Sequence, residues 1–330
     1  MVGYWASSGV VLAQTASKPE LYVQSGAPGM LSALAFSSDG RYLAGKTGGT
    51  ILIWDVEKGM ELRRMESHFK GDSPLALSRD AKFLATAGED GGIELWDVAL
   101  GMVLGKPVAS TKSIFSVAFS PDGRFLVGSH VDTITLWETA GDGREVSMSD
   151  AGERVASVAV SPDNRFVASI SKENIKLWDI ESKKPVKTFS AKNAEDLTES
   201  LLFAADGRLL ALSRGLGASL WEVENPKKIL SLLWFEAVGV PVAVNPRNEI
   251  LALGHPNSSF VALLDWKNSK CIRSFDATAN KITGLAFTSD GKSMFLGYDK
   301  GEIRQVDLTS GRILRALNGV PSDGQDLRGL

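Results

Sequence analysis

The chain has 330 residues, enough for one closed all-β domain or for two average domains. With 44% hydrophobic and 23% charged residues, its composition is typical of a globular protein. The net charge of −3 gives no basic surface for nucleic acid, and the single cysteine, Cys271, excludes an intrachain disulfide and a cysteine-based metal cluster.

Residues 1–18 admit two interpretations. The apolar run at 9–13 (GVVLA) would suit signal-peptidase cleavage after Ala13, but no Lys or Arg stands near Met1. The segment is therefore either a residual signal peptide or a tail, and the protein either exported or cytoplasmic. No membrane span is predicted, because a span takes about 20 apolar residues.

From residue 19 onward the chain repeats itself, and such self-similarity at a fixed period indicates a repeat fold. One marker is a dipeptide with successive gaps of 42, 41, 41, 43, 43 and 42 residues. It begins at Trp54, Trp96, Trp137, Trp178 and Trp221, and in degraded form at Leu264 and Val306. A second marker, a turn of the Asp-Gly-Arg kind, follows the same period. Seven units over residues 19–318 are thus predicted, followed by a tail at 319–330.

Each unit is predicted to form four short strands, here named a to d. In the third unit these are 115–119, 124–128, 133–137 and 145–148; the run 133–137 (TITLW) alternates polar and apolar residues, as a strand does. The intervening Pro121-Asp122-Gly123 predicts a turn, because Pro presets φ and Gly accepts positive φ. No sustained helical period is present, so almost no helix is expected.

Four-stranded units of this length with a Trp-Asp signature resemble the WD-repeat β-propellers. The resemblance implies an all-β fold, a single seven-bladed β-propeller of four-stranded antiparallel blades, with Trp54, Trp137, Trp178 and Trp221 as repeat anchors. The turn style is similar to bacterial WD-repeat regions, which are in some cases fused to caspase-like or other effector domains.

The same resemblance implies a hydrogen-bonded tetrad in the second unit. Its members would be Thr86 on strand b, His68 before strand a, Asp90 in the b–c turn and Trp96 on strand c. The other units lack a histidine at the position of His68. The ring is therefore expected to be held mostly by apolar packing.

Two segments compete for the outer strand of the last unit. Residues 20–25 (ELYVQS) stand at the offset from the first strand a that a strand d occupies, and 312–317 (RILRAL) also read as a strand d. The N-terminal segment is favoured to close the last blade, with the C-terminal segment as the alternative.

Catalytic chemistry is not indicated. No nucleophile elbow or phosphate-binding glycine loop is present. The repeated Asp residues are interpreted as turn residues, and His130 and His255 fall in b–c loops three blades apart, which does not predict a metal site. No catalytic residue, metal or cofactor is therefore expected.

Partner binding is predicted on the face where the d–a and b–c loops meet. The residues expected there are Met30, Phe69, Arg154, Lys172, Lys281 and Tyr298. Trp234 and Phe235 stand in an unusually apolar d–a connection, and they either cover the sixth blade or form an exposed aromatic anchor.

These features predict a non-catalytic scaffold for protein–protein interaction, with other proteins or peptides of unknown identity as partners. It would act as a monomer or within a heteromeric complex, as the sensor or regulatory part of a larger signalling protein. The alternative is a propeller-fold enzyme of the lactonase, lyase or hydrolase type with a site at the central channel.

Overall fold

The computed structural model describes most of the chain between residues 31 and 317. The described ranges are 31–37, 41–47, 49–55, 60–69, 73–88, 92–108, 114–139, 145–148, 154–171, 174–190, 198–204, 206–213, 217–223, 227–232, 242–245, 247, 249–254, 260–268, 270–276, 281–288, 290–298 and 303–317. The predicted tails at 1–18 and 319–330 lie outside these residues.

All elements in the described residues are strands, and none is a helix that could cross a membrane. They form seven four-stranded sheets. The first three contain β1 (Leu31–Phe36), β2 (Tyr42–Thr47), β3 (Thr50–Asp55), β4 (Met60–Glu66); β5 (Leu75–Leu77), β6 (Phe83–Ala87), β7 (Ile93–Asp97), β8 (Met102–Val108); and β9 (Ser116–Phe119), β10 (Phe125–Ser129), β11 (Ile134–Glu138), β12 (Glu145–Met148). The next two contain β13 (Ser157–Val160), β14 (Phe166–Ile170), β15 (Asn174–Asp179), β16 (Lys184–Ser190); and β17 (Thr198–Phe203), β18 (Leu209–Ser213), β19 (Gly217–Glu222), β20 (Lys227–Leu232). The last two contain β21 (Val242–Val244), β22 (Ile250–Gly254), β23 (Phe260–Asp265), β24 (Lys270–Asp276); and β25 (Ile282–Phe287), β26 (Ser293–Tyr298), β27 (Ile303–Asp307), β28 (Ile313–Leu317).

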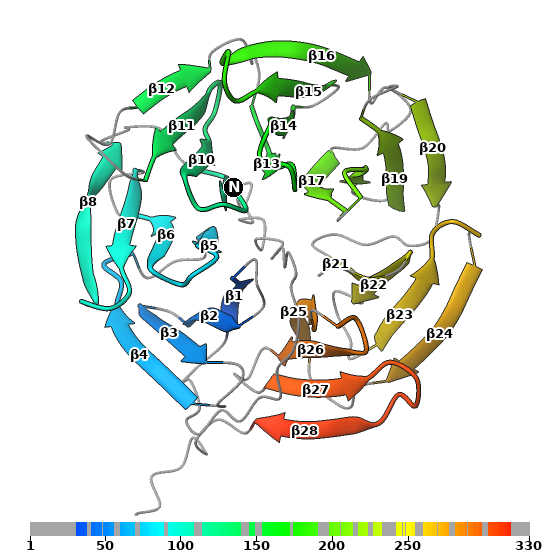
Figure 1. Cartoon of the computed structure of the whole chain (residues 1–330). Coiled ribbons are helices and arrows are strands. Elements are labelled where there is room, and N and C mark those ends of the chain that lie inside the picture. The colour runs from blue at the N-terminus through cyan, green and yellow to red at the C-terminus, as the bar shows by residue number, and fades with distance from the viewer. Residues whose placement is uncertain are drawn as a thin grey trace, which may run out of the picture.

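Each sheet is an antiparallel meander of consecutive strands, and the sheets stand around a common centre (Figure 1). The first strand of each sheet lies toward the centre and the fourth toward the rim. The last sheet lies beside the first, because β1 contacts β25 and β26. The predicted all-β propeller with four-stranded antiparallel blades is confirmed.

The predicted strand positions agree closely with the observed ones. In the third unit the prediction for strand d matches β12, and the other three strands are displaced by one residue at one or both ends. The alternation of apolar and polar residues, together with the turn residues, therefore locates the strands along the sequence. A strand displaced by one residue along its partner would turn its apolar side chains to the opposite face of the sheet.

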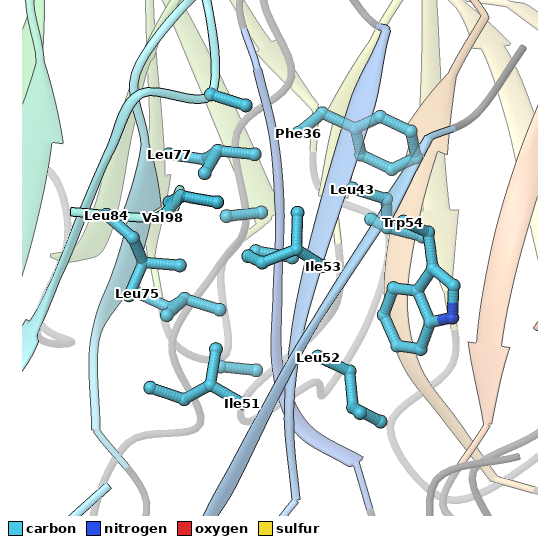
Figure 2. Packing of buried hydrophobic residues seen from close by; sticks show 14 of the residues in the cluster. Phe36, Leu43, Ile51, Leu52, Ile53, Trp54, Leu75, Leu77, Leu84 and Val98 are labelled. Atoms are coloured by element: carbon cyan, nitrogen blue, oxygen red, sulfur yellow. The ribbon is translucent and has the colours of Figure 1, made fainter. Parts of the chain in front are cut away.

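The core lies between neighbouring sheets, and the largest cluster joins the last, first and second (Figure 2). Along β3, Ile51 and Ile53 point toward Leu75, Leu77 and Leu84 of the second sheet, while Trp54 points the other way. Both faces of β3 are buried for this reason, and its residues 51–55 are all buried. On the far side, the rings of Phe36 and Phe295 stack with centroids 5.8 Å apart, so apolar contact links the first and last sheets.

The recurrent turns between strands a and b are built by a hydroxyl and a carboxylate. In the second unit, Ser78 Oγ donates to Asp80 Oδ1 at 2.9 Å, and Asp80 accepts the backbone N–H of Lys82 at 3.1 Å. The third, fourth and last units repeat both bonds at Asp122, Asp163 and Asp290. Gly123 adopts a φ of 74°. The interpretation of these Asp residues as turn residues is confirmed.

The prediction that the N-terminal segment closes the last sheet is wrong. The strand beside β27 is β28, which pairs from Val306 with Ile313 to Ile303 with Leu317. The C-terminal strand occupies this slot because it continues the meander directly from β27 through a tight turn at Ser310 and Gly311. Residues 20–25 lie outside the described residues.

Candidate partner-binding face

The links that enter each inner strand and the links between the second and third strands emerge on one face of the sheets, since the strands alternate in direction. The structure describes this face in part. Phe69, Phe115, Arg154 and Lys281 stand on links that enter inner strands. This face is called the entry face below.

Three predicted partner-binding residues are found on the entry face. Arg154 and Lys281 are exposed, and Phe69 is half-buried. Tyr298 was predicted at an exposed loop tip, and this is wrong: it is 0% exposed and packs into the core of the last two sheets. Its side chain is the last of β26, where neighbouring strands cover it. Trp234, Phe235, Met30 and Lys172 lie outside the described residues.

Arg154 and Phe115 form a contact between adjacent blades that the sequence did not predict. The Arg154 guanidinium lies over the Phe115 ring, 4.2 Å from its centroid. Phe115 precedes β9 and Arg154 precedes β13, and these inner strands touch. A guanidinium on an aromatic face keeps its hydrogen-bond donors at the ring edge, where a partner can reach them. The pair therefore presents a cationic and an apolar group side by side.

A buried lysine supports Phe69 in the neighbouring sector. Lys46, near the end of β2, is 0% exposed, and its Nζ donates to Ser73 Oγ at 2.6 Å. The same Nζ lies 4.9 Å from the centroid of the Phe69 ring. Ser73 Oγ also bonds Thr86 Oγ1 at 3.1 Å. Because a buried ammonium is costly without such partners, this cluster fixes the link that leads into the second sheet. One feature of the sequence could have indicated this cluster: Lys46 stands in an otherwise mostly apolar second strand.

The tetrad predicted in the second unit does not form as expected. Thr86 bonds Ser73, and the 68%-exposed His68 places Nδ1 3.5 Å from Glu94 Oε1. The His68 ring stacks on Trp96 with centroids 6.4 Å apart, but Trp96 Nε1 has no hydrogen-bond partner in the described part of the chain. The predicted hydrogen bond between the Trp96 indole and the Thr86 hydroxyl is therefore wrong. Asp90 lies outside the described residues.

The indole bond expected in the second unit is found in the fourth. Trp178 Nε1 donates to Ser169 Oγ at 2.9 Å, with both side chains buried. Ser169 holds the position on its second strand that Thr86 holds in the second sheet. The four predicted anchors, Trp54, Trp137, Trp178 and Trp221, are all buried. Apolar packing is what they share.

No other chemistry gathers on the described residues. They contain no group of three or more His, Cys, Asp or Glu that could hold a metal ion. His130 is 2% exposed and meets Trp137 edge to face, with ring centroids 6.5 Å apart, so it belongs to the core. His255 lies outside the described residues.

Comparison with known proteins agrees with the architecture. A family model described as "Outer membrane protein assembly factor BamB" matches residues 80–317. A model described as "WD domain, G-beta repeat" matches residues 19–55 and 60–97. No curated protein matches the chain. The first match spans well over half of the 330 residues. The chain therefore belongs to the propeller family described by the BamB model, and its repeats make it a WD-repeat β-propeller.

Proposed function

We propose that the chain is a non-catalytic scaffold that binds other proteins or peptides through its entry face. The observation that carries the proposal is the pair of Arg154 and Phe115, an exposed guanidinium held on an aromatic ring at the junction of two blades. Arginine and aromatic residues are enriched at the centres of protein interfaces. A guanidinium already seated on a ring loses less side-chain freedom when a partner binds.

The exposed guanidinium of Arg154 indicates which chemical group of a partner it could bind. Arg154 and Lys281 are both exposed on the entry face. A carboxylate can receive two parallel hydrogen bonds from one guanidinium. We therefore propose a partner that brings an acidic side chain or a chain terminus next to an apolar group.

The wider architecture supports a binding role. The matching family is named for an assembly factor, and the WD match covers the first two repeats. We infer further that the seven sheets form one closed, seven-bladed ring, which would give the entry face a rigid frame. Such a platform would work as a monomer or as part of a heteromeric complex, as the sensor or regulatory part of a larger protein.

The proposal is tested by capture on the full-length chain with one charge reversed on each face. Arg154→Asp alters the entry face, and Arg165→Asp is the matched control, because Arg165 also lies over an aromatic ring, that of Phe166 at 4.9 Å, but on the opposite face. We expect proteins captured from a native extract by the parent chain to remain with Arg165→Asp and to be lost with Arg154→Asp. Circular dichroism checks that both variants fold.

The outcome that would reject the proposal is equally specific. Equal capture by the parent and both folded variants would show that Arg154 contributes nothing to recognition. Loss of the captured proteins with Arg165→Asp alone would indicate that the binding surface lies on the opposite face.

A further inference from the structure

One outer strand, β12, differs from the other six in how it pairs with its sheet. In the other six sheets the outer strand carries an extra residue beside the Trp, Leu or Val that begins the repeated dipeptide, so the register shifts there. The pairing of β12 with β11 is unbroken, from Ile134 with Met148 to Trp137 with Glu145. An extra residue disrupts the ladder and twists an edge strand away from further pairing. The outer edge of β12 therefore lacks a feature that protects the other six edges.

The strand also lacks the basic residues that the other outer strands carry. Each of the other six contains at least one Lys or Arg, whereas β12 (EVSM) contains none. Such residues oppose the addition of a further strand, because pairing would take their charge out of water. Two of them also bind the next sheet: Arg63 donates to the Ala99 carbonyl, and Lys187 Nζ donates to the Val223 carbonyl at 3.0 Å. Val146 holds the corresponding place in β12.

We propose that an extended segment of a partner protein adds to the outer edge of β12 as a fifth strand of the third sheet. This strand lies at the rim of the molecule (Figure 1), and in the described residues no strand pairs with its outer edge. An edge strand presents unpaired backbone N–H and C=O groups, which an added strand can satisfy. The edge is a different surface from the pair of Arg154 and Phe115, and the proposal does not depend on the function proposed above.

The side chains of β12 indicate what the segment carries. Met148 is 2% exposed and packs with Val158 of the fourth sheet, so Val146, two residues earlier, lies on the same face. Val146 is half-buried, whereas Ser147, on the opposite face, is exposed. The one charged residue of β12 is acidic, Glu145. Because opposite charges on paired strands attract, the segment is expected to place an apolar residue beside Val146 and to carry Lys or Arg among its other residues.

A flexible segment fits this edge better than a second copy of the chain. With four residues, β12 is the shortest of the outer strands. Two folded copies joined only along so short an edge would bury far less than the roughly 1,200 Å² that stable interfaces need. An extended segment can pair with the edge and continue onto the entry face, where β12 ends. A short edge also makes binding depend on the side chains of the segment, which gives selectivity.

Peptide selection on the full-length chain tests the site. The probe is a phage-displayed library of random short peptides, and fluorescence anisotropy measures binding of the selected ones. Ser147→Lys gives β12 the charge that other outer strands carry. Thr188→Lys on β16 is the matched control, because Thr188 is also exposed and pairs, like Ser147, with the residue two before the repeat tryptophan. We expect Ser147→Lys to weaken binding about tenfold and Thr188→Lys to leave it unchanged. Circular dichroism checks that both variants fold.

Backbone methylation distinguishes strand addition from other modes of binding. A strand added to an edge uses the N–H of every second residue to pair with it. N-methylation of one alternating set of residues in a selected peptide should therefore weaken binding about tenfold, while methylation of the other set changes it less than about twofold. The bound peptide should also slow hydrogen exchange in a fragment covering residues 145–148 and leave one covering 184–190 unchanged.

Each opposite result would overturn the proposal. These results are failure to select any peptide, equal binding by the parent and Ser147→Lys, equal weakening by the two methylated sets, and slower exchange at another outer strand only. A dimer of the parent chain that Ser147→Lys abolishes would instead assign the edge to a second copy. The methylation and exchange measurements use the parent chain, so they decide the question even where a variant does not fold.

Discussion

At the scale of single residues, the turns between the third and fourth strands show how one φ angle selects glycine. Gly101, Lys183 and Gly311 occupy the same position, and each donates its N–H to the Asp four residues earlier at 2.8 Å. Their φ angles are 68°, 60° and 70°. A side chain at such an angle costs about 1–2 kcal/mol, so Lys183 is a strained member of the set.

Lys183→Gly relieves this strain, which stabilises the folded state. The larger conformational entropy of glycine in the unfolded chain offsets part of the gain, so the free energy of unfolding is expected to rise by about 0.5–1 kcal/mol. Gly101→Ala is the reverse change, and an added Cβ there meets only ordinary contacts at 3.6 and 3.7 Å. It should lower the free energy of unfolding by about 1 kcal/mol. Urea denaturation measures both. Destabilisation by Lys183→Gly would contradict the assignment of strain.

The same turns make stability depend on pH. The pKa of Asp179 is lowered by the backbone N–H of Ser182, that of Asp265 by the Asn268 amide, and that of Asp307 by the Ser310 hydroxyl. A carboxylate with a lowered folded pKa contributes stability above its unfolded pKa, about 3.9, and loses it as pH falls through the folded value. The free energy of unfolding should therefore fall below about pH 4. The triple variant Asp179→Asn, Asp265→Asn, Asp307→Asn should lose less unfolding free energy than the parent as the pH falls below about 4. An equal loss would show that other groups cause the decrease at acid pH.

At the scale of the strand pair, two buried indoles offer a matched comparison. Trp178 donates to Ser169, whereas Trp54 Nε1 has no hydrogen-bond partner in the described part of the chain, and glycine, Gly45, holds the place of Ser169 in its sheet. Trp178→Phe loses a bond in addition to ring area. It should therefore cost about 1 kcal/mol more in unfolding free energy than Trp54→Phe. Equal costs in urea denaturation would mean that the bond adds nothing net.

The strands could be predicted from the sequence because the same sequence signals recur from unit to unit. A turn carboxylate, a glycine and an alternating strand recur, so an error in one unit is corrected by the others. Side-chain partners could not be predicted in this way. Trp96 has the threonine that a tetrad requires, yet the Thr86 hydroxyl bonds Ser73 Oγ, which in turn accepts a hydrogen bond from Lys46 Nζ. The outcome depends on a lysine from another sheet.

At the scale of the whole molecule, the sequence supplied the number of units but not how they meet. Tyr298 ends a strand whose repeat position indicated an exposed loop tip, and neighbouring strands bury it completely. Likewise both terminal segments read as an outer strand, and only the continuation of the meander from β27 decides that β28 holds the place. Burial at a junction depends on two units at once, which a single repeat cannot reveal.

Closure between the first and last sheets can be measured directly. Phe36 and Phe295 stack across this junction, and stacked aromatic pairs contribute about 0.5–1.5 kcal/mol beyond their buried area. A double-mutant cycle with Phe36→Leu and Phe295→Leu should give a coupling energy of about 1 kcal/mol in urea denaturation. The control cycle joins Phe36→Leu with Phe189→Leu, since Phe189 stacks on Trp221 in another core cluster, and should give none. A coupling near zero in the first cycle would mean that the first and last sheets of the repeat array do not pack together in solution.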